Sequence, residues 1–390
     1  MIKIAFVSNY FNHHQSSFSD AMAHRPETDY HFIETMPMEA ERKSMGWGGD
    51  DRPAYVLPAY ESEATRARCE AIVREADFIV VGSGSAPDAW LAERHRAGSF
   101  IFRATERLYK DGCPRWQIPL RSVKNHFRFN RWPNDYLLCA SAFTAADAAI
   151  TRSYLGKAYR WGYFPVVKEQ NLDALVARKR SNPVLSLLWA GRFLDWKHPD
   201  AALAAAEALK AKGIPFHLDI IGTGEMEDTL RLMIQEKGLS DCVTMLGSMT
   251  PEQVRDHMER ADIYLFTSDR GEGWGAVLNE SMNSACAVVA SHAIGSVPFL
   301  IRDGENGFIY QDGDLGHLSQ LVLRLAEDRA LRERLGAAAY QTMASEWNAD
   351  IAAERLVALY EDLRAHGSSS RFQEGPCSPA PILSDDWYQK

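Results

Sequence analysis

The stretch that decides the fold is DIYLFTSDRGEGWGAVLNESMNSACAVVAS, residues 262–291. An apolar run ends near Thr267, a glycine-rich loop follows, a helix is expected from about Gly275, and a second apolar run spans 287–291. Runs without polar alternation are typical of parallel strands covered by helices on both faces. The stretch therefore predicts a strand–loop–helix–strand unit of an α/β domain.

The same alternation of apolar runs and helical segments continues over both halves of the chain. The expected strands lie at 2–8, 29–34, 77–83, 99–104 and 136–141, and then at 184–191, 216–222, 242–247, 262–268 and 287–291. Such alternation implies βαβ units, so we expect two doubly wound, Rossmann-like α/β domains. Three further helices are expected at about 315–327, 330–345 and 349–365.

These patterns divide the chain into five segments. We expect an N-terminal domain (1–165), a polar linker ending in Asn-Pro (166–183), a second domain (184–348), a C-terminal helix (349–366) and a loose Ser/Pro-rich tail (367–390).

Composition excludes several classes of protein. The 390 residues are 46% hydrophobic and 24% charged, which is typical of a globular chain, and the net charge of −9 argues against a nonspecific nucleic-acid binder. The six cysteines form no C-x-x-C pair, so we expect reduced thiols rather than a disulfide frame or a zinc site. No window approaches the roughly 18 apolar residues of a membrane span, and the N-terminal apolar run is too short for a signal peptide. We expect a cytoplasmic protein, peripheral to a membrane at most.

Two glutamates flank the glycine-rich loop of 262–291. Glu272 opens the Gly273-Trp274-Gly275 segment, and Glu280 lies in the helix that follows. Glycines let backbone N–H groups approach a ligand, and a helix N-terminus suits a phosphate. With the carboxylates roughly 10 Å apart at 1.5 Å per helical residue, the loop fits a nucleotide sugar. For either glutamate alone, a solvated surface position is the competing interpretation.

Two further segments follow predicted strands. Arg192 and Lys197 come after the strand that ends at Gly191, where two cations either neutralise a diphosphate or are ordinary surface charge. Gly222-Thr223-Gly224 matches half of a dinucleotide fingerprint, but the third glycine is missing, so an NAD-type site is discounted.

Residues 184–365 resemble the retaining glycosyltransferases of family four, which have the GT-B architecture. The segments that carry the resemblance are GRFLDWKHPDAAL (191–203), IIGTGEMEDTL (220–230), EGWGAVLNE (272–280) and HAIGSVPFLIRDGENGFIY (292–310). The first half is similar only in its βα alternation and its opening strand. The resemblance implies two Rossmann-like domains that face a cleft, with the C-terminal helix returning to the first domain.

The resemblance also implies roles for individual residues. Arg192 and Lys197 would bind the donor diphosphate, Glu272 the hydroxyls of the donor sugar, and Glu280 the ribose. The remaining donor-side residues would be Gly222, Gly224, Gly273, Trp274, Gly275 and Ala276, with Gly295 and Ser296 in the wall after the next strand. The family retains configuration at the anomeric carbon and needs no bound metal or other cofactor, and the donor would be a UDP- or GDP-linked sugar.

Three features depart from or complicate this pattern. The loop after the first strand, SNYFNHHQSS (8–17), has no glycine but offers Asn9, Asn12, His13 and His14. Either His13 or His14 enters the site, or one of these four side chains caps the helix that starts near Gln15 or Ser16. Glu106 is our candidate for the first-domain residue near the anomeric carbon. The one D-x-D sequence, Asp312-Gly313-Asp314, precedes a helix, so Asp314 is interpreted as an N-cap rather than a metal ligand.

The acceptor side is expected in the first half. Residues 94–131 hold ten Lys or Arg against two acidic residues, with aromatic side chains interleaved. This mixture suits an anionic membrane surface or a lipid diphosphate, whereas the alternative is a solvated helix face with core aromatics.

The sequence thus predicts a retaining transferase that moves a sugar from a nucleotide-diphosphate donor to a hydroxyl of a glycan or a lipid-linked acceptor, in polysaccharide or glycoconjugate biosynthesis. A noncatalytic nucleotide-sugar-binding protein and a GT-B epimerase are the alternatives.

Overall fold

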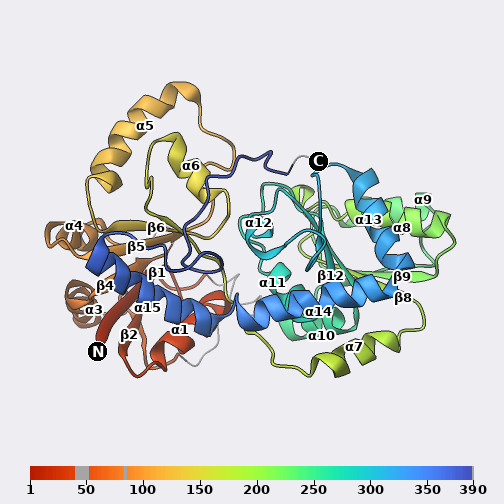
Figure 1. Cartoon of the computed structure of the whole chain (residues 1–390), viewed down its shortest axis with the longest axis horizontal. Helices are drawn as coiled ribbons and strands as arrows, with labels where there is room; N and C mark the ends of the chain where they lie inside the picture. The colour runs from red at the N-terminus through yellow and green to blue at the C-terminus, as the bar shows by residue number, and fades with distance from the viewer. Residues whose placement is uncertain (40–51, 83–85, 389–390) are drawn as a thin grey trace. The chain divides into compact units, whose positions relative to one another are not determined.

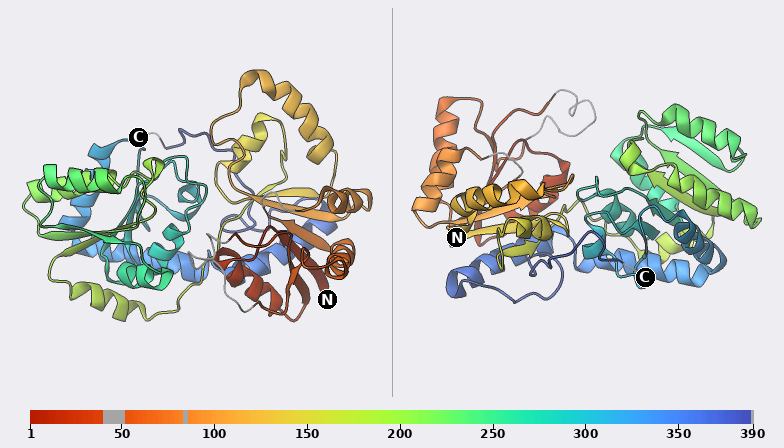
Figure 2. Two further views of the ribbon diagram at one scale, coloured as in Figure 1. Left: turned by 180° about the vertical axis from the view of Figure 1, so that it is seen from behind. Right: turned by 90° about the horizontal axis from the view of Figure 1, so that it is seen from above.

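The computed structural model describes residues 1–39, 52–82 and 86–388. The chain divides into two compact units, labelled by element in Figure 1. Unit 1 comprises Met1–Val166 and Asn348–Ser384, and unit 2 comprises Val167–Trp347 and Asp385–Lys390. Each unit is built on one parallel sheet with helices on either side, as the two views of Figure 2 show. The predicted fold class is confirmed.

The sheet of unit 1 has seven strands in the order β3-β2-β1-β4-β5-β6-β7. The strands are β1 (Ile2–Ser8), β2 (Thr28–Glu34), β3 (Val56–Pro58), β4 (Phe78–Val81), β5 (Phe100–Thr105), β6 (Asp135–Cys139) and β7 (Ala158–Arg160). The helices are α1 (His13–Ala23), α3 (Glu63–Glu75), α4 (Asp88–Arg96), η1 (Arg115–Gln117), α5 (Ile118–Asn125), η2 (His126–Asn130), α6 (Thr144–Ile150) and α15 (Ala349–His366). The sequence did not predict β3 and β7, because three-residue edge strands leave too short an apolar pattern.

The sheet of unit 2 has six strands in the order β10-β9-β8-β11-β12-β13. The strands are β8 (Leu185–Ala190), β9 (Phe216–Ile221), β10 (Val243–Gly247), β11 (Ile263–Phe266), β12 (Ala287–Ser291) and β13 (Phe308–Tyr310). The helices are α7 (Leu172–Arg180), η3 (Asp195–Lys197), α8 (Ala201–Ala211), α9 (Glu227–Glu236), α10 (Pro251–Arg260), α11 (Val277–Asn283), α12 (Val297–Leu300), α13 (Leu315–Glu327) and α14 (Arg329–Ser345). The capping box predicted at Thr250 is present at the start of α10.

The strand order reverses beside β1 in unit 1 and beside β8 in unit 2. In open α/β sheets, ligands bind outside the carboxyl ends of the strands at such a reversal. In unit 2, β8 pairs with β11 on one side and with β9 on the other. The loops that follow β8, β9 and β11 therefore meet at one edge of the sheet. These are the loops in which the sequence predicted donor-site residues.

The final helix belongs to unit 1, as predicted. The ring of Tyr360 on α15 lies 4.9 Å from the ring of Phe78 and 5.1 Å from that of Phe100, both on strands of the unit-1 sheet. Because Tyr360 is buried, this contact holds α15 against the sheet.

The segment expected to be a linker is a folded part of unit 2. Within 166–183, α7 buries Leu175, and the ammonium of Lys179 donates to the carbonyl of Met258 at 3.0 Å and to that of Ala261. The prediction of a linker was wrong because α7 attaches through a long, buried lysine as well as through apolar contacts, and its sequence therefore looks polar.

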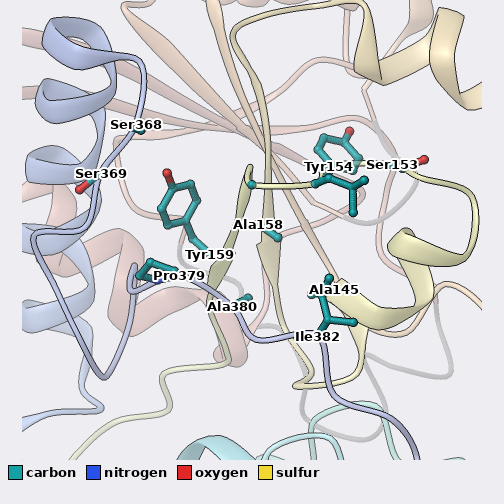
Figure 3. Close-up of a pocket in the computed structure, with 12 residues that line it drawn as sticks. Ala145, Ser153, Tyr154, Ala158, Tyr159, Ser368, Ser369, Pro379, Ala380 and Ile382 are labelled. Atoms are coloured by element: carbon teal, nitrogen blue, oxygen red, sulfur yellow. The ribbon is translucent and has the colours of Figure 1, made fainter.

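The segment expected to be a loose tail is also packed. The N–H of Arg160 donates to the carbonyl of Ser378 at 2.7 Å, and Cys377 and Ser378 are buried. Figure 3 shows this segment beside Tyr159, where it helps to enclose a pocket of about 150 Å³. The tail extends the edge of the sheet through backbone hydrogen bonds, which leave no trace in side-chain periodicity.

The six cysteines are free, and five of them are buried, in agreement with the prediction of reduced thiols. Among the described helices, none combines the length and apolar character that crossing a membrane requires.

Candidate functional site

Glu272 lies at the carboxyl edge of the unit-2 sheet and is largely buried. Its side chain is 12% exposed, and its Oε2 atom lies 2.5 Å from the ammonium of Lys197. The hydroxyl of Ser268 donates to the same oxygen at 3.1 Å. A solvated loop glutamate would have neither partner, so this interpretation is wrong for Glu272. Ser268, two residues after the end of β11, was not predicted from the sequence.

Lys197 and Glu272 meet because β8 and β11 are neighbours. The hydroxyl of Thr267, at the end of β11, donates to the carbonyl of Lys197 at 2.9 Å and also accepts the indole N–H of Trp189 at 2.8 Å. These buried bonds fix the loop after β8 against the loop after β11. Arg192 follows the same strand as Lys197, is exposed, and has no ion pair within the described part of the chain.

The loop between the glutamates needs glycine at position 275. Gly275 has φ +81°, and a Cβ atom there would lie 2.4 Å from the ring of Phe266 and 3.1 Å from the Cγ atom of Glu272. Trp274 is fully buried, donates to the side-chain oxygen of Asn279 at 2.9 Å and packs on Trp347 at 5.8 Å. Its side chain therefore anchors the loop and is not available to a ligand.

Glu280 lies in the first turn of α11, which begins at Val277, two residues later than expected. Burial raises the pKa of this carboxyl, and the charges of Arg255 and Lys168 offset part of the rise. Among the described residues, its carboxylate has no hydrogen-bond or ion-pair partner. A half-buried acceptor without a partner is suited to the hydroxyl groups of a ligand.

Gly222 and Gly224 have a structural role between two loops. A Cβ atom on Gly222 would lie 1.8 Å from the carbonyl oxygen of Gly191, and one on Gly224 would lie 2.5 Å from that of Phe193. The N–H of Phe193 also donates to the carbonyl of Thr223 at 2.9 Å. The two glycines are required for the close approach of the loops after β8 and β9, and contact with a donor stays a prediction.

The wall after β12 contains an unusual hydroxyl. Ser296 follows Gly295 directly before α12 and is fully buried, yet its hydroxyl has no hydrogen-bond partner among the described residues.

The D-x-D sequence has a structural role at its second aspartate. Asp314 accepts the N–H of His317 at 2.8 Å and so caps α13, as predicted. Burial raises the pKa of the neighbouring Asp312. The described residues contain no group of three or more His, Cys, Asp or Glu side chains that could hold a metal ion.

The first-domain candidates form one cluster in unit 1. Asn12, and neither histidine, caps α1 by accepting the N–H of His14 at 2.9 Å. The rings of His13 and His14 lie 3.9 Å apart, and His14 stacks on Tyr163 at 5.4 Å. The hydroxyl of Tyr163 donates to Glu106 at 2.7 Å. Tyr163, which the sequence analysis did not identify, thus connects the histidines to Glu106.

The cluster has a defined charge state at neutral pH. Burial, together with the neighbouring His13, lowers the pKa of His14 to about 3, so this imidazole is neutral. The carboxylate of Glu106 lies 3.5 Å from the ammonium of Lys110. A neutral imidazole and a paired carboxylate suit hydrogen bonding to hydroxyl groups.

A pocket of about 430 Å³ lies at the carboxyl ends of β4 and β5 in unit 1. Gly82, Thr105 and Arg128 are among the residues that line it. Arg103 also lines it, but its guanidinium is committed to Asp135 at 2.9–3.1 Å. The exposed residues Arg128 and Asp88 also line the pocket, so it presents one cation and one carboxylate besides the Arg103–Asp135 pair.

The basic stretch 94–131 is not one continuous surface. Arg94 is buried and donates to four backbone carbonyls, whereas Arg103 and Arg107 pair with Asp135 and Asp147. These three arginines hold the fold together. The prediction of an exposed basic surface therefore applies only to the other basic residues of 94–131, chiefly those in 115–131.

The chain has two doubly wound domains, and the second carries a glutamate-lysine pair at the carboxyl edge of its sheet. This combination defines the class as GT-B. Residues 177–342 match the family described as glycosyl transferases group 1. The resemblance found from the sequence motifs is confirmed.

Two curated relatives match over part of their length. The chain is 31% identical to the amylovoran biosynthesis glycosyltransferase AmsK of Erwinia amylovora over 46% of this chain and 45% of AmsK. It is 25% identical to alpha-D-kanosaminyltransferase of Streptomyces kanamyceticus over 71% of this chain and 64% of that protein. The chain thus spans less than two thirds of the length of both.

Among solved structures, Anabaena HepE in complex with UDP superposes with a TM-score of 0.65 at 16% identity, over 93% of this chain and 100% of that one. At this identity the likeness establishes a common fold.

Proposed function

We propose that the chain is a retaining glycosyltransferase that moves a sugar from a nucleotide-diphosphate donor, UDP- or GDP-linked, to a hydroxyl of a glycan or lipid-linked acceptor. The observation that carries the proposal is the edge of unit 2, where a buried glutamate-lysine pair lies on the loops after two adjacent strands. A second carboxylate in the same unit, that of Glu280, has no hydrogen-bond or ion-pair partner among the residues that the structure describes.

On this proposal, each group on unit 2 has one task. Arg192 and Lys197 bind the diphosphate, and cationic groups held in place stabilise the charge that develops as it leaves. Because α11 has only seven residues, we assign the diphosphate to the cations rather than to the helix dipole. Glu272 orients the sugar hydroxyls, Glu280 accepts the ribose hydroxyls, and backbone groups at Gly273–Ala276 line the donor.

The transfer step needs no metal or other cofactor on this proposal. The bond from the anomeric carbon to the diphosphate oxygen breaks, and a bond to the acceptor oxygen forms on the same face of the sugar. The acceptor proton passes to the departing diphosphate. The protein contributes positioning and fixed charge.

We assign the acceptor to unit 1. The His13–His14–Tyr163–Glu106 cluster offers hydrogen-bonding groups for hydroxyls, and the 430 Å³ pocket with Arg128 suits an acceptor that carries a phosphate. AmsK acts in amylovoran biosynthesis, which supports a role in polysaccharide biosynthesis, and the complex of HepE with UDP supports a nucleotide-sugar donor. Cytoplasmic location with peripheral membrane contact through 94–131 belongs to the same proposal.

The test is release of nucleoside diphosphate from UDP- and GDP-sugars, measured with pooled lipid and oligosaccharide acceptors. Glu272→Ala should lower the rate about 100-fold, the usual loss when one transition-state contact is removed. The control is Glu236→Ala, on an exposed glutamate at the far end of α9, which should keep the wild-type rate. Equal rates in wild type and Glu272→Ala would overturn the site assignment.

The two alternatives have distinct outcomes in the same assay. A noncatalytic binding protein would be stabilised by a nucleoside diphosphate but would release none from any donor and acceptor. An epimerase would convert the donor sugar without an acceptor, which product analysis would reveal.

A further inference from the structure

Residues 115–130 form a helical rod at the rim of unit 1 with no buried residue. The segment runs from η1 through α5 to η2, and Figure 1 shows it standing clear of the sheet. Helices in globular proteins normally bury one apolar stripe against the core. This one leaves its stripe exposed.

The exposed stripe consists of four large apolar side chains. They are Trp116 at 77% exposure, Leu120 at 72%, Val123 at 58% and Phe127 at 59%. At about 100° per residue, these positions fall within an arc of roughly 60° on one face of a helix. A contiguous apolar face on a helix marks an interaction surface, unlike scattered single residues.

The charge around the stripe has one sign. Residues 112–134 contain no Asp or Glu, and they contain Arg115, Arg121, Lys124, Arg128 and Arg131. Within the described part of the chain, none of these five cations has an ion pair. Arg131 instead stacks on Trp132 at 4.1 Å, and Arg121 on Tyr109 at 5.1 Å. The cations are therefore available to an anionic surface.

The other face of the rod is fixed to the body of unit 1. The amide of Asn125 donates to the hydroxyl of Thr151 at 3.0 Å, and the amide of Asn130 donates to the carbonyl of Arg152 at 2.9 Å. Both bonds attach the segment to the residues that follow α6, so the apolar stripe stays directed outward.

We propose that the segment 115–131 lies in the interface of an anionic membrane, with the four apolar side chains below the headgroups and the cations against lipid phosphates. Amphipathic helices with a basic polar face and Trp, Phe or Leu on the other bind membranes in this way. A second copy of the chain is a poorer occupant, because five like charges would then face five more. The inference rests on the membrane contact of the proposed function, which it assigns to named residues and to an anionic lipid surface, and its test needs no donor or acceptor.

The experiment is sedimentation of the full chain with vesicles of phosphatidylcholine, alone or mixed with phosphatidylglycerol. Wild type should bind the anionic vesicles, and binding should weaken as salt is raised. Lys124→Gln with Arg128→Gln should lower the partition coefficient about 30-fold, as expected for two basic residues at an anionic surface. Lys212→Gln in unit 2, also an exposed lysine, is the charge control and should bind like wild type.

The apolar stripe is tested separately by Trp116→Ser with Phe127→Ser, against Leu232→Ser in unit 2, whose side chain is similarly exposed at 59%. The stripe variant should lose most of its vesicle binding, whereas the control should keep it. Equal binding by wild type and both variants would overturn the proposal. So would self-association of wild type without lipid that the stripe variant abolishes, because the occupant would then be a second copy. Either result concerns lipid binding alone, and the donor-site assignment is tested separately by nucleoside diphosphate release.

Discussion

At the edge of the unit-2 sheet, the candidate site residues lie on loops whose shape is fixed by buried residues, whereas unit 1 brings distant segments together through side chains. Trp274, Gly275 and Thr267 shape the loop that carries Glu272. In unit 1, by contrast, Tyr163 connects His14 to Glu106. The residues of the unit-2 site are close together in the sequence and form recognisable motifs. The unit-1 cluster is assembled from separate segments, so it forms no such motif.

The largest difference between the units should appear at two tryptophans. Trp274→Ala removes a fully buried indole from unit 2 and should lower the free energy of unfolding by about 3–5 kcal/mol. Trp116→Ala removes an indole that is 77% exposed in unit 1 and should change it by about 0.5 kcal/mol or less. Urea unfolding of both variants measures this, and similar losses would contradict the contrast.

Glu280 should show opposite effects on stability and binding. Burial raises the pKa of its carboxyl in the folded protein, so the ionised group destabilises the native state as pH rises through that pKa. Glu280→Gln should therefore raise stability at neutral pH, with the gain fading in acid. The same change should weaken nucleoside diphosphate binding about tenfold, because a charge-assisted hydrogen bond is lost.

Thermal unfolding between pH 4 and pH 8 and calorimetric titration check the two effects. A variant that binds nucleoside diphosphates as tightly as wild type would remove Glu280 from the donor site.

The unit-1 cluster should affect transfer but not donor binding. Tyr163→Phe removes the 2.7 Å hydrogen bond to Glu106 and keeps the ring that stacks on His14. Loss of one such bond corresponds to about 0.5–1.5 kcal/mol, so transfer should fall between about 2-fold and 10-fold. The affinity for nucleoside diphosphate should stay unchanged. If that affinity fell with transfer, the division of tasks between the units would be wrong.

The pH dependence of stability tests the environment of His14. Its pKa is lowered to about 3 in the folded protein from an ordinary 6.5, so the unfolded chain binds a proton that the native state excludes. This contribution to stability is present above pH 6.5 and is lost as pH falls toward 3. His14→Gln should flatten the stability profile over this range, as urea titrations at several pH values would show. An unchanged slope would contradict burial of a neutral imidazole.

The candidate site of unit 2 could be proposed from the sequence because its residues follow one another closely. The segment 262–291 holds a strand, a loop and a helix, so Glu272, Gly275 and Glu280 could be identified together. Lys197 could be identified as following a strand, but its pairing with Glu272 depends on the order of β8 and β11, which spacing alone does not give.

What escaped prediction depended on backbone pairing and on long-range contacts. Tyr163 follows β7, a three-residue strand without a readable pattern, and Ser378 joins the sheet through main-chain bonds. The basic stretch was predicted from composition, but only the structure separates buried Arg94 from exposed Arg128. Side-chain direction along a helix decides that division, and composition does not report it.

The central claim is that unit 2 binds the diphosphate of the donor through the cations after β8. The most direct measurement is the thermal shift of the full chain with UDP, GDP and ADP, repeated for Arg192→Ala with Lys197→Ala. At 100 times its Kd, one nucleoside diphosphate should stabilise the wild type by about 2.7 kcal/mol, and the double variant should show no shift at that concentration. An equal shift in wild type and double variant, or no shift of the wild type with any of the three, would contradict the account.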